Sequence, residues 1–228
     1  MGTMIITLDG PAGSGKSTVA CELAKRLKLP FLDTGAMYRG VTAACLDRGI
    51  DPASHPESVA SLVRESRIWF AWKRDPPALH VDEVDMTTRL RDPDTTKAVS
   101  DVAAMPEVRT ALVDAQRRIS ADLGRLVTEG RDQGSIVFPD ARVKFYLDAR
   151  PTVRARRRAQ EMRDAGQQID EGEMLEQLRH RDRRDTTRQD GPLICPSDAI
   201  RLDTSEMGLG EVVDRVEVEA RRIIGDQV

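Results

Sequence analysis

Residues 10–17 bring together glycines, a lysine and a serine at a spacing that suits phosphate binding. The segment Gly10-Pro11-Ala12-Gly13-Ser14-Gly15-Lys16-Ser17 fits the P-loop pattern G-x-x-x-x-G-K-[ST]. An apolar run at 4–8 precedes the segment and a helical pattern from Val19 follows it, which are the flanks that a P-loop requires. The alternative, a glycine-rich turn that carries a lysine by chance, is disfavoured because spacing and flanks agree.

Each part of this loop has a chemical task. The glycines allow a tight turn whose backbone N–H groups converge on phosphate oxygens, and the following helix adds its dipole. Lys16 would bring a positive charge to the β- and γ-phosphates, and Ser17 would offer its hydroxyl to Mg²⁺. We therefore expect a nucleoside triphosphate site built from Gly10, Pro11, Ala12, Gly13, Ser14, Gly15, Lys16, Ser17 and Thr18.

Short apolar runs alternate with helical patterns along most of the chain, which is typical of an α/β fold with a parallel sheet. The pattern predicts strands at 4–8, 31–32, 126–128, 143–147 and 199–202, with a closing helix striped by Leu209, Val212, Val213, Val216, Ala220 and Ile223. Ligands of such sheets bind beyond the carboxyl ends of the strands. The polar segments 33–39 and 129–134 are therefore expected at the edge where the chemistry occurs.

The region 67–103 has a different character. Runs at 67–72, 78–81 and 83–86 predict a small antiparallel meander. Both tryptophans, Trp69 and Trp72, lie in it; they could stack on a base, but packing of the small sheet is the favoured interpretation. Helices are expected at 92–104 and 106–123, with Arg109 beside the apolar stripe of the second.

Eleven arginines lie between Arg150 and Arg188. Arg154, Arg157 and Arg158 share one helical face, and Arg181, Asp185 and Arg188 follow helical spacing after a turn near Gly166. Two arginine-lined helices joined by a flexible turn suggest a mobile lid. The alternative is a solvated helix pair with weak ion pairs, and it is preferred for Arg156, Arg163, Arg179 and Arg183.

The composition sets limits on the class of protein. A formal net charge of -3 and 39% hydrophobic residues argue against a disordered chain and against a basic nucleic-acid-binding domain. The three widely spaced cysteines indicate neither disulfides nor a zinc site. The sequence also contains no apolar run of membrane-spanning length. We expect a cytoplasmic monomer without nucleic-acid or membrane partners.

Four motifs together resemble bacterial cytidylate kinase, from Ile5 to about Ile224. They are the P-loop, Asp33-Thr34-Gly35-Ala36-Met37-Tyr38-Arg39, Glu129-Gly130-Arg131-Asp132-Gln133-Gly134 and Arg181-Asp182-Arg183-Arg184-Asp185-Thr186-Thr187-Arg188. The resemblance implies transfer of the γ-phosphoryl group of ATP to CMP or dCMP with Mg²⁺. It also implies one three-layer, adenylate-kinase-like P-loop domain over residues 1–228, with a five-stranded parallel sheet. The implied core is 1–66, 104–150 and 190–228, with a nucleoside-monophosphate-binding insert at about 67–103 and a helical lid at about 151–189.

The same resemblance implies roles for individual residues. Cytosine recognition falls to Ser100, Arg109 and Asp132, and the acceptor phosphate to Arg39, Arg131 and Arg188. Arg181 and Asp185 would bind the sugar hydroxyls, and Thr34 and Tyr38 belong to the same CMP site. Lys16 and Arg131, with Arg154, Arg157 and Arg158 closing over the ATP phosphates, form the implied catalytic set. Gln133 stands where Met is common in the family.

Two other functions stay open at this point. A kinase of the same fold could use UMP or AMP, and the base-reading residues decide between these acceptors. A P-loop switch or a nucleic-acid-binding ATPase has only the arginine-rich lid in its favour, and the acidic net charge opposes it. None of the three histidines is expected to act as a general base, since a phosphate acceptor is already ionised near pH 7.

Overall fold

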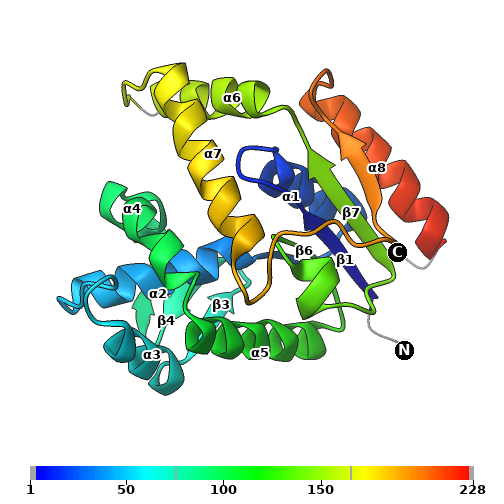
Figure 1. The fold of residues 1–228 in the computed structure, drawn as a ribbon. Coiled ribbons are helices and arrows are strands. Elements are labelled where there is room, and N and C mark those ends of the chain that lie inside the picture. The colour runs from blue at the N-terminus through cyan, green and yellow to red at the C-terminus, as the bar shows by residue number, and fades with distance from the viewer. Residues whose placement is uncertain (1–3, 75, 165, 226–228) are drawn as a thin grey trace. The chain divides into compact units, whose positions relative to one another are not determined.

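The computed structural model describes residues 4–74, 76–164 and 166–225, which form two compact units (Figure 1). The first unit contains the chain up to Leu32 and again from Gly124 onward. The second unit contains Asp33–Leu123. The P-loop, the segment 129–134 and the expected lid belong to the first unit, and the meander belongs to the second.

A five-stranded sheet organises the first unit (Figure 1). Its strand order is β2-β6-β1-β7-β8, and β1 runs parallel to both of its neighbours. The register pairs Asp9 with Gly130, so the P-loop and the segment after Gly130 leave the same edge of the sheet. The α/β class and the five-stranded parallel sheet are confirmed. The strands are β1 (Met4–Asp9), β2 (Phe31–Asp33), β6 (Arg125–Gly130), β7 (Val143–Asp148) and β8 (Ile200–Asp203).

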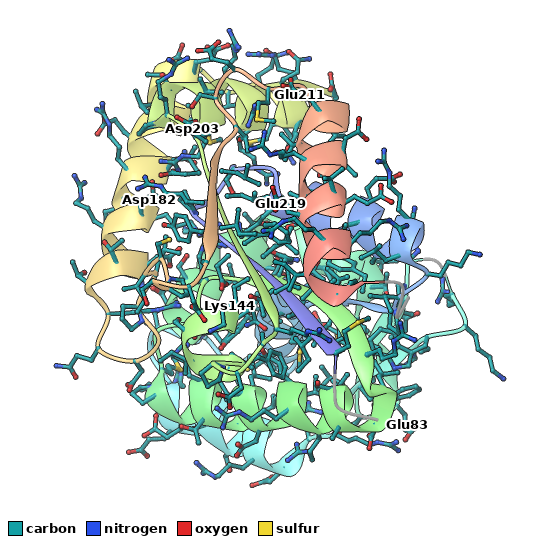
Figure 2. All side chains as sticks on the ribbon, turned by 90° about the vertical axis from the view of Figure 1, so that its right-hand side faces the viewer. Glu83, Lys144, Asp182, Asp203, Glu211 and Glu219 are labelled. Carbon is teal, nitrogen blue, oxygen red and sulfur yellow. The ribbon has the colours of Figure 1, made fainter. Side chains whose placement is uncertain are left out.

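Helices α1 (Lys16–Leu27) and α8 (Leu209–Ile224) share one hydrophobic core with β1, β6 and β7. Figure 2 shows α8, marked by Glu211 and Glu219, beside the sheet. Every residue of β1 is buried, which agrees with its mainly apolar sequence, interrupted by Thr7 and ending in Asp9. Among the described residues, no helix has the length and apolarity that crossing a bilayer would need.

Helices α6 (Pro151–Asp164) and α7 (Glu171–Thr187) form the expected arginine-rich pair. Their own small core contains Ala155, Ala159, Met174 and Leu178 together with Ala12 of the P-loop. Gly166 lies in their connection with a φ of 79°, a conformation that glycine adopts without strain. The pair is thus packed onto the P-loop in this structure.

In its described residues, the second unit combines α-helices with the small antiparallel sheet that the sequence predicts. Prolines begin α3, α4 and α5, where a missing N–H costs nothing. Its elements are α2 (Thr34–Asp47), α3 (Pro56–Glu65), β3 (Ile68–Ala71), β4 (Ala78–Val81), β5 (Val84–Asp85), a 3₁₀ turn η1 (Thr87–Arg91), α4 (Pro93–Val102) and α5 (Pro106–Leu123).

The tryptophans pack against neighbours of the small sheet. Trp69 stacks on His80 with ring centroids 4.3 Å apart, and Trp72 lies 5.2 Å from Phe70 in a tilted arrangement. The indole N–H of Trp69 also donates to the Asp82 carbonyl at 2.9 Å. These contacts agree with the favoured interpretation, in which the tryptophans pack the sheet.

Two details of the helical stripes were predicted wrongly. Arg109 is not beside the buried face of α5 but within it, at 4% exposure. A guanidinium tolerates this position because it can donate to a carbonyl and face an aromatic ring, as described below. In α8, Leu209 is 52% exposed while Ile224 is 1% exposed, so the buried stripe begins one turn later and ends one residue later than expected.

The end of β6 also differs from the prediction. Glu129 and Gly130 belong to the strand instead of a loop, because they continue its pairing with Leu8 and Asp9 of β1. The turn that follows is a short π-helical segment, η2 (Gln133–Val137).

Replacing Ile224 by alanine should lower the free energy of unfolding by about 2–5 kcal/mol, because it deletes a fully buried side chain. Leu209→Ala is the matched control and should change it by less than about 0.5 kcal/mol, since this side chain faces water. Urea unfolding of both variants measures the difference. Equal losses would contradict the observed placement of the α8 stripe.

Candidate active site

The P-loop leaves β1 at Gly10 in close contact with the neighbouring strand. A Cβ atom at Gly10 would lie 2.1 Å from the Leu147 carbonyl oxygen of β7, so only glycine fits. Lys16 is 5% exposed, and its Nζ donates to the Pro11 carbonyl at 3.1 Å. The ammonium group of Lys16 is therefore folded inside the loop that the sequence predicts to hold phosphates.

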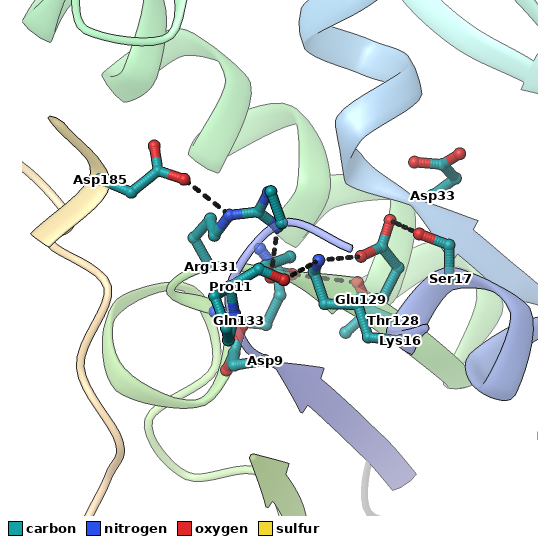
Figure 3. Close-up of polar contacts among 12 residues, drawn as sticks. Asp9, Pro11, Lys16, Ser17, Asp33, Thr128, Glu129, Arg131, Gln133 and Asp185 are labelled. Carbon is teal, nitrogen blue, oxygen red and sulfur yellow. Dashed lines mark hydrogen bonds and ion pairs between the residues drawn. The ribbon is translucent and has the colours of Figure 1, made fainter. Parts of the chain in front are cut away.

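Glu129, at the end of β6, faces the P-loop (Figure 3). Its Oε1 accepts a hydrogen bond from Ser17 Oγ at 2.9 Å, and its Oε2 lies 3.9 Å from Lys16 Nζ. Burial, and after it the charge of Arg131, lower the pKa of Lys16 well below its usual value, although Glu129 acts in the opposite direction. An anionic phosphate next to Lys16 would favour the charged ammonium.

Arg131 follows β6 and pairs with Asp185 of α7. Its Nε donates to Asp185 Oδ2 at 2.8 Å, and both side chains are mostly buried (Figure 3). Burial by itself would raise the pKa of Asp185, but the surrounding arginines outweigh it and hold this pKa below its usual value. These arginines are Arg131, Arg181 and Arg188. Three of the predicted CMP-binding residues, all arginines, therefore act on the carboxylate of a fourth, Asp185.

The two residues after Arg131 are buried. Asp132 is 5% exposed and Gln133 is 1% exposed. The Gln133 Oε1 accepts a hydrogen bond from Thr128 Oγ1 at 3.0 Å, so its side chain turns toward β6 (Figure 3). Gln133 thus has a packing role inside the first unit.

The three lid arginines of the predicted catalytic set have different surroundings. Arg154 is buried and donates to the carbonyls of Ala12 and Ala149, each at 2.9 Å, and to Asp182 at 2.7 Å. Arg157 donates to Thr204 and to the Met207 carbonyl, beyond β8. Arg158 pairs with Glu161 on the outer face of α6. Of these three arginines, Arg154 donates to the P-loop itself, at the Ala12 carbonyl.

The remaining predicted CMP-binding residues belong to the second unit. Asp33 caps α2 by accepting from the Ala36 N–H at 2.8 Å, and its carboxylate also holds Arg39 at 3.0 Å. The guanidinium of Arg109 lies 6.0 Å from the ring centre of Tyr38, and it donates to the Ala103 carbonyl at 3.5 Å. Within this unit, Thr34 is buried at the start of α2, and Ser100 is half-buried on α4.

Glu129 is the side chain that sequence reasoning left without a role. The sequence places it near the end of a strand, but only the strand order shows that this strand is the neighbour of β1. Among the described residues, no group of three or more His, Cys, Asp or Glu side chains could hold a metal ion by itself. Ser17 and Glu129 nevertheless offer oxygen atoms of the kind that Mg²⁺ binds together with nucleotide phosphates.

Comparisons with known proteins agree with this arrangement. The family model for cytidylate kinase matches residues 6–222. A cytidylate kinase of Nocardia farcinica is 40% identical over 225 residues, which cover 99% of this chain and 95% of that protein. A cytidylate kinase of Corynebacterium efficiens is 44% identical over 214 residues, covering 93% of this chain and 92% of that protein.

Solved structures of more distant proteins share the fold. An uncharacterized protein from Eubacterium ventriosum has a TM-score of 0.52 at 13% identity, over 96% of this chain and 99% of that one. A gluconokinase from Sinorhizobium meliloti has a TM-score of 0.51 at 14% identity, over 96% and 93% of the two chains. Likeness at these identities shows the fold alone.

Asp185→Asn should lower the free energy of unfolding at pH 7 by about 1–3 kcal/mol, because Arg131 loses a charged and largely buried partner. The folded pKa of Asp185 lies below the unfolded value of about 3.9. Its stabilisation is therefore complete above about pH 4 and is lost as the pH falls through the folded pKa. Urea unfolding at several pH values checks both points.

Glu176→Gln is the matched control for this substitution. Glu176 pairs with Arg179, and both side chains are half exposed or more, so the loss at pH 7 should stay below about 1 kcal/mol. An Asp185→Asn difference that is equally small would show that the Arg131 pair contributes little.

Proposed function

Because this chain belongs to the cytidylate kinase family, we propose that it transfers the γ-phosphoryl group of ATP to CMP or dCMP, giving ADP and CDP or dCDP. One observation carries the proposal beyond family membership. The pairing of Asp9 with Gly130 starts the P-loop and the Gly130-Arg131-Asp132 segment side by side at one sheet edge. Groups suited to a donor phosphate and to an acceptor phosphate thus meet where α/β enzymes bind ligands.

The donor side of the reaction is proposed for the P-loop. Backbone N–H groups of 10–18 would surround the ATP phosphates, and Lys16 would neutralise charge that develops during transfer. Arg154, Arg157 and Arg158 would assist from α6. The contact from Arg154 to the Ala12 carbonyl supports this assignment best, because it already links α6 to the tip of the loop.

The acceptor side is proposed for the arginines around Asp185. Arg131 and Arg188, with Arg39 of the second unit, would hold the CMP phosphate, because guanidinium groups bind phosphate oxygens in pairs. Arg181 and Asp185 would bind the sugar. The base, which needs both donors and an acceptor, is assigned to Ser100, Arg109 and Asp132, with Thr34 and Tyr38 lining the same CMP site.

Mg²⁺ is the cofactor that this site suits. Ser17 and Glu129 would hold it, directly or through water, with the nucleotide phosphates completing its coordination. When bound, the ion neutralises phosphate charge. The hydrogen bond between these two side chains supports the fit, because it places a hydroxyl and a carboxylate beside Lys16.

The proposed mechanism relies on alignment and charge neutralisation. A phosphate monoester has a second pKa near 6, so the attacking oxygen of CMP is ionised at pH 7 and needs no general base. Lys16 and Arg131 supply positive charge on the two sides of the transferred group. The three cysteines form no disulfide in the structure, which suits a reducing compartment, and we propose that the enzyme works as a cytoplasmic monomer.

A coupled assay of ADP formation from Mg-ATP should show strong preference for CMP and dCMP over UMP, AMP and GMP, each offered as sole acceptor. UMP reverses the donor and acceptor pattern at positions 3 and 4 of the ring, so a site built for cytosine should reject it. Turnover with UMP alone would overturn the base-reading assignment and keep the kinase. Turnover with none of the five would overturn the proposed function.

Arg131→Ala should lower kcat/KM for CMP by about 10- to 100-fold, the equivalent of one charged hydrogen-bonded contact, and leave the Kd for ATP within about twofold. Arg183→Ala is the matched control, because this arginine is exposed on α7. Steady-state kinetics and calorimetric ATP binding provide both readouts. Unchanged CMP kinetics would remove Arg131 from the acceptor site.

A further inference from the structure

Asp9 is a buried carboxylate that the proposed reaction does not use. It is the last residue of β1, directly before Gly10, and it is 1% exposed. Its Oδ1 accepts from the backbone N–H of Gln133 at 2.9 Å, and its Oδ2 accepts from that of Gly134 at 2.7 Å. Figure 3 shows Asp9 beside Gln133. The main chain of Asp9 thus continues into the P-loop while its side chain holds the segment that follows Arg131.

The packing around Gly134 leaves no space for a Cβ atom. A Cβ atom there would lie 2.9 Å from Thr7 Oγ1, 3.2 Å from Lys144 Cδ and 3.3 Å from Asp9 Oδ2. The segment 131–134, called the acceptor segment below, therefore packs directly against β1 through Gln133 and Gly134. A side chain of any size at position 134 would push it away from Asp9.

The two N–H donors favour the charged form of the Asp9 carboxylate. Burial raises the pKa of Asp9 to about 7, and the two backbone hydrogen bonds act against this rise. The carboxylates that act on it are Asp132, which follows Arg131, and Glu129 of β6, while Asp9 itself raises the pKa of Tyr146 in β7 and of Cys195 before β8. Since the two carboxylates repel it, the N–H groups of Gln133 and Gly134 are the favourable contacts that offset its burial.

We propose that Asp9 is a positioning residue that fixes the acceptor segment 131–134 against the P-loop and thereby sets Arg131 for the CMP phosphate. The inference rests on the proposed assignment of Arg131. Phosphoryl transfer depends on alignment of donor and acceptor, and a small displacement of a positioning group is costly. The two hydrogen bonds that the Asp9 carboxylate accepts tie the acceptor segment to the central strand and so maintain that alignment.

Two substitutions test the contact from its two sides. Asp9→Asn keeps the shape but turns an amide NH₂ toward one of the N–H donors, which removes one hydrogen bond. Gly134→Ala inserts the Cβ that Asp9 and Thr7 leave no room for. Each should raise KM for CMP and lower kcat/KM for CMP by about tenfold, while the Kd for ATP stays within about twofold. The double variant should be little worse than the poorer single variant, because both break one contact.

Two control variants separate the proposed effect from the added methyl group and from a general loss of stability. Gly210→Ala adds a Cβ where no atom lies within 4 Å, and Val216→Ala weakens the core under α8 at a fully buried position. Both should leave the KM for CMP unchanged. The Val216 variant shows what general destabilisation does to the kinetics.

The following outcomes would overturn the inference. Unchanged CMP kinetics in both test variants would show that Asp9 does not position Arg131. Equal weakening of ATP and CMP binding would make Asp9 a structural part of the P-loop only. If Arg131→Ala has no effect on CMP kinetics, the acceptor assignment fails and this inference fails with it. If Arg131→Ala is impaired while the Asp9 and Gly134 variants are normal, only the inference fails.

Discussion

The burial of the Lys16 ammonium among the carbonyl and carboxylate oxygens of its own fold is the interaction on which the active centre depends. A buried cation is costly, and this one is held by the Pro11 carbonyl and lies near Glu129. Burial and the charge of Arg131 lower the pKa of Lys16, and a bound anion would act in the opposite direction. Lys16 and several arginines lie close together here. Their mutual repulsion would destabilise the fold unless carbonyl and carboxylate oxygens offset it.

The central strand β1 holds the segments that carry these charges. β1 carries the P-loop, pairs with β6 and β7, and ends in a carboxylate that accepts two N–H groups of the segment after Arg131. Because β1 is buried along its whole length, its end is a rigid reference point. The P-loop and the segment 131–134, which we propose bind the donor and acceptor phosphates, are therefore both attached to this one strand.

The arginine-rich helices are tied to the same centre by carboxylates. Asp182 holds Arg154, which also donates to the P-loop, and Asp185 holds Arg131. Each of these ion pairs joins segments that are far apart in sequence. Each carboxylate also offsets the repulsion between its arginine and the other positive charges nearby. Other arginines of the same helices, such as Arg158 and Arg179, pair locally on the outer face and have no such constraint.

The sequence by itself determined the elements whose signals are local. The P-loop spacing, the five strands of the α/β pattern, the antiparallel meander and the helix pair around Gly166 were all predictable, because apolar periodicity, prolines and glycines act within a few residues. The family motifs also identified the chemistry. Only the tertiary structure decided that Glu129 faces Ser17, that Asp9 holds the acceptor segment, that Arg109 is buried and that Leu209 is exposed. These outcomes depend on which strands are neighbours and which helix face meets the core, and no spacing along the chain carries that information.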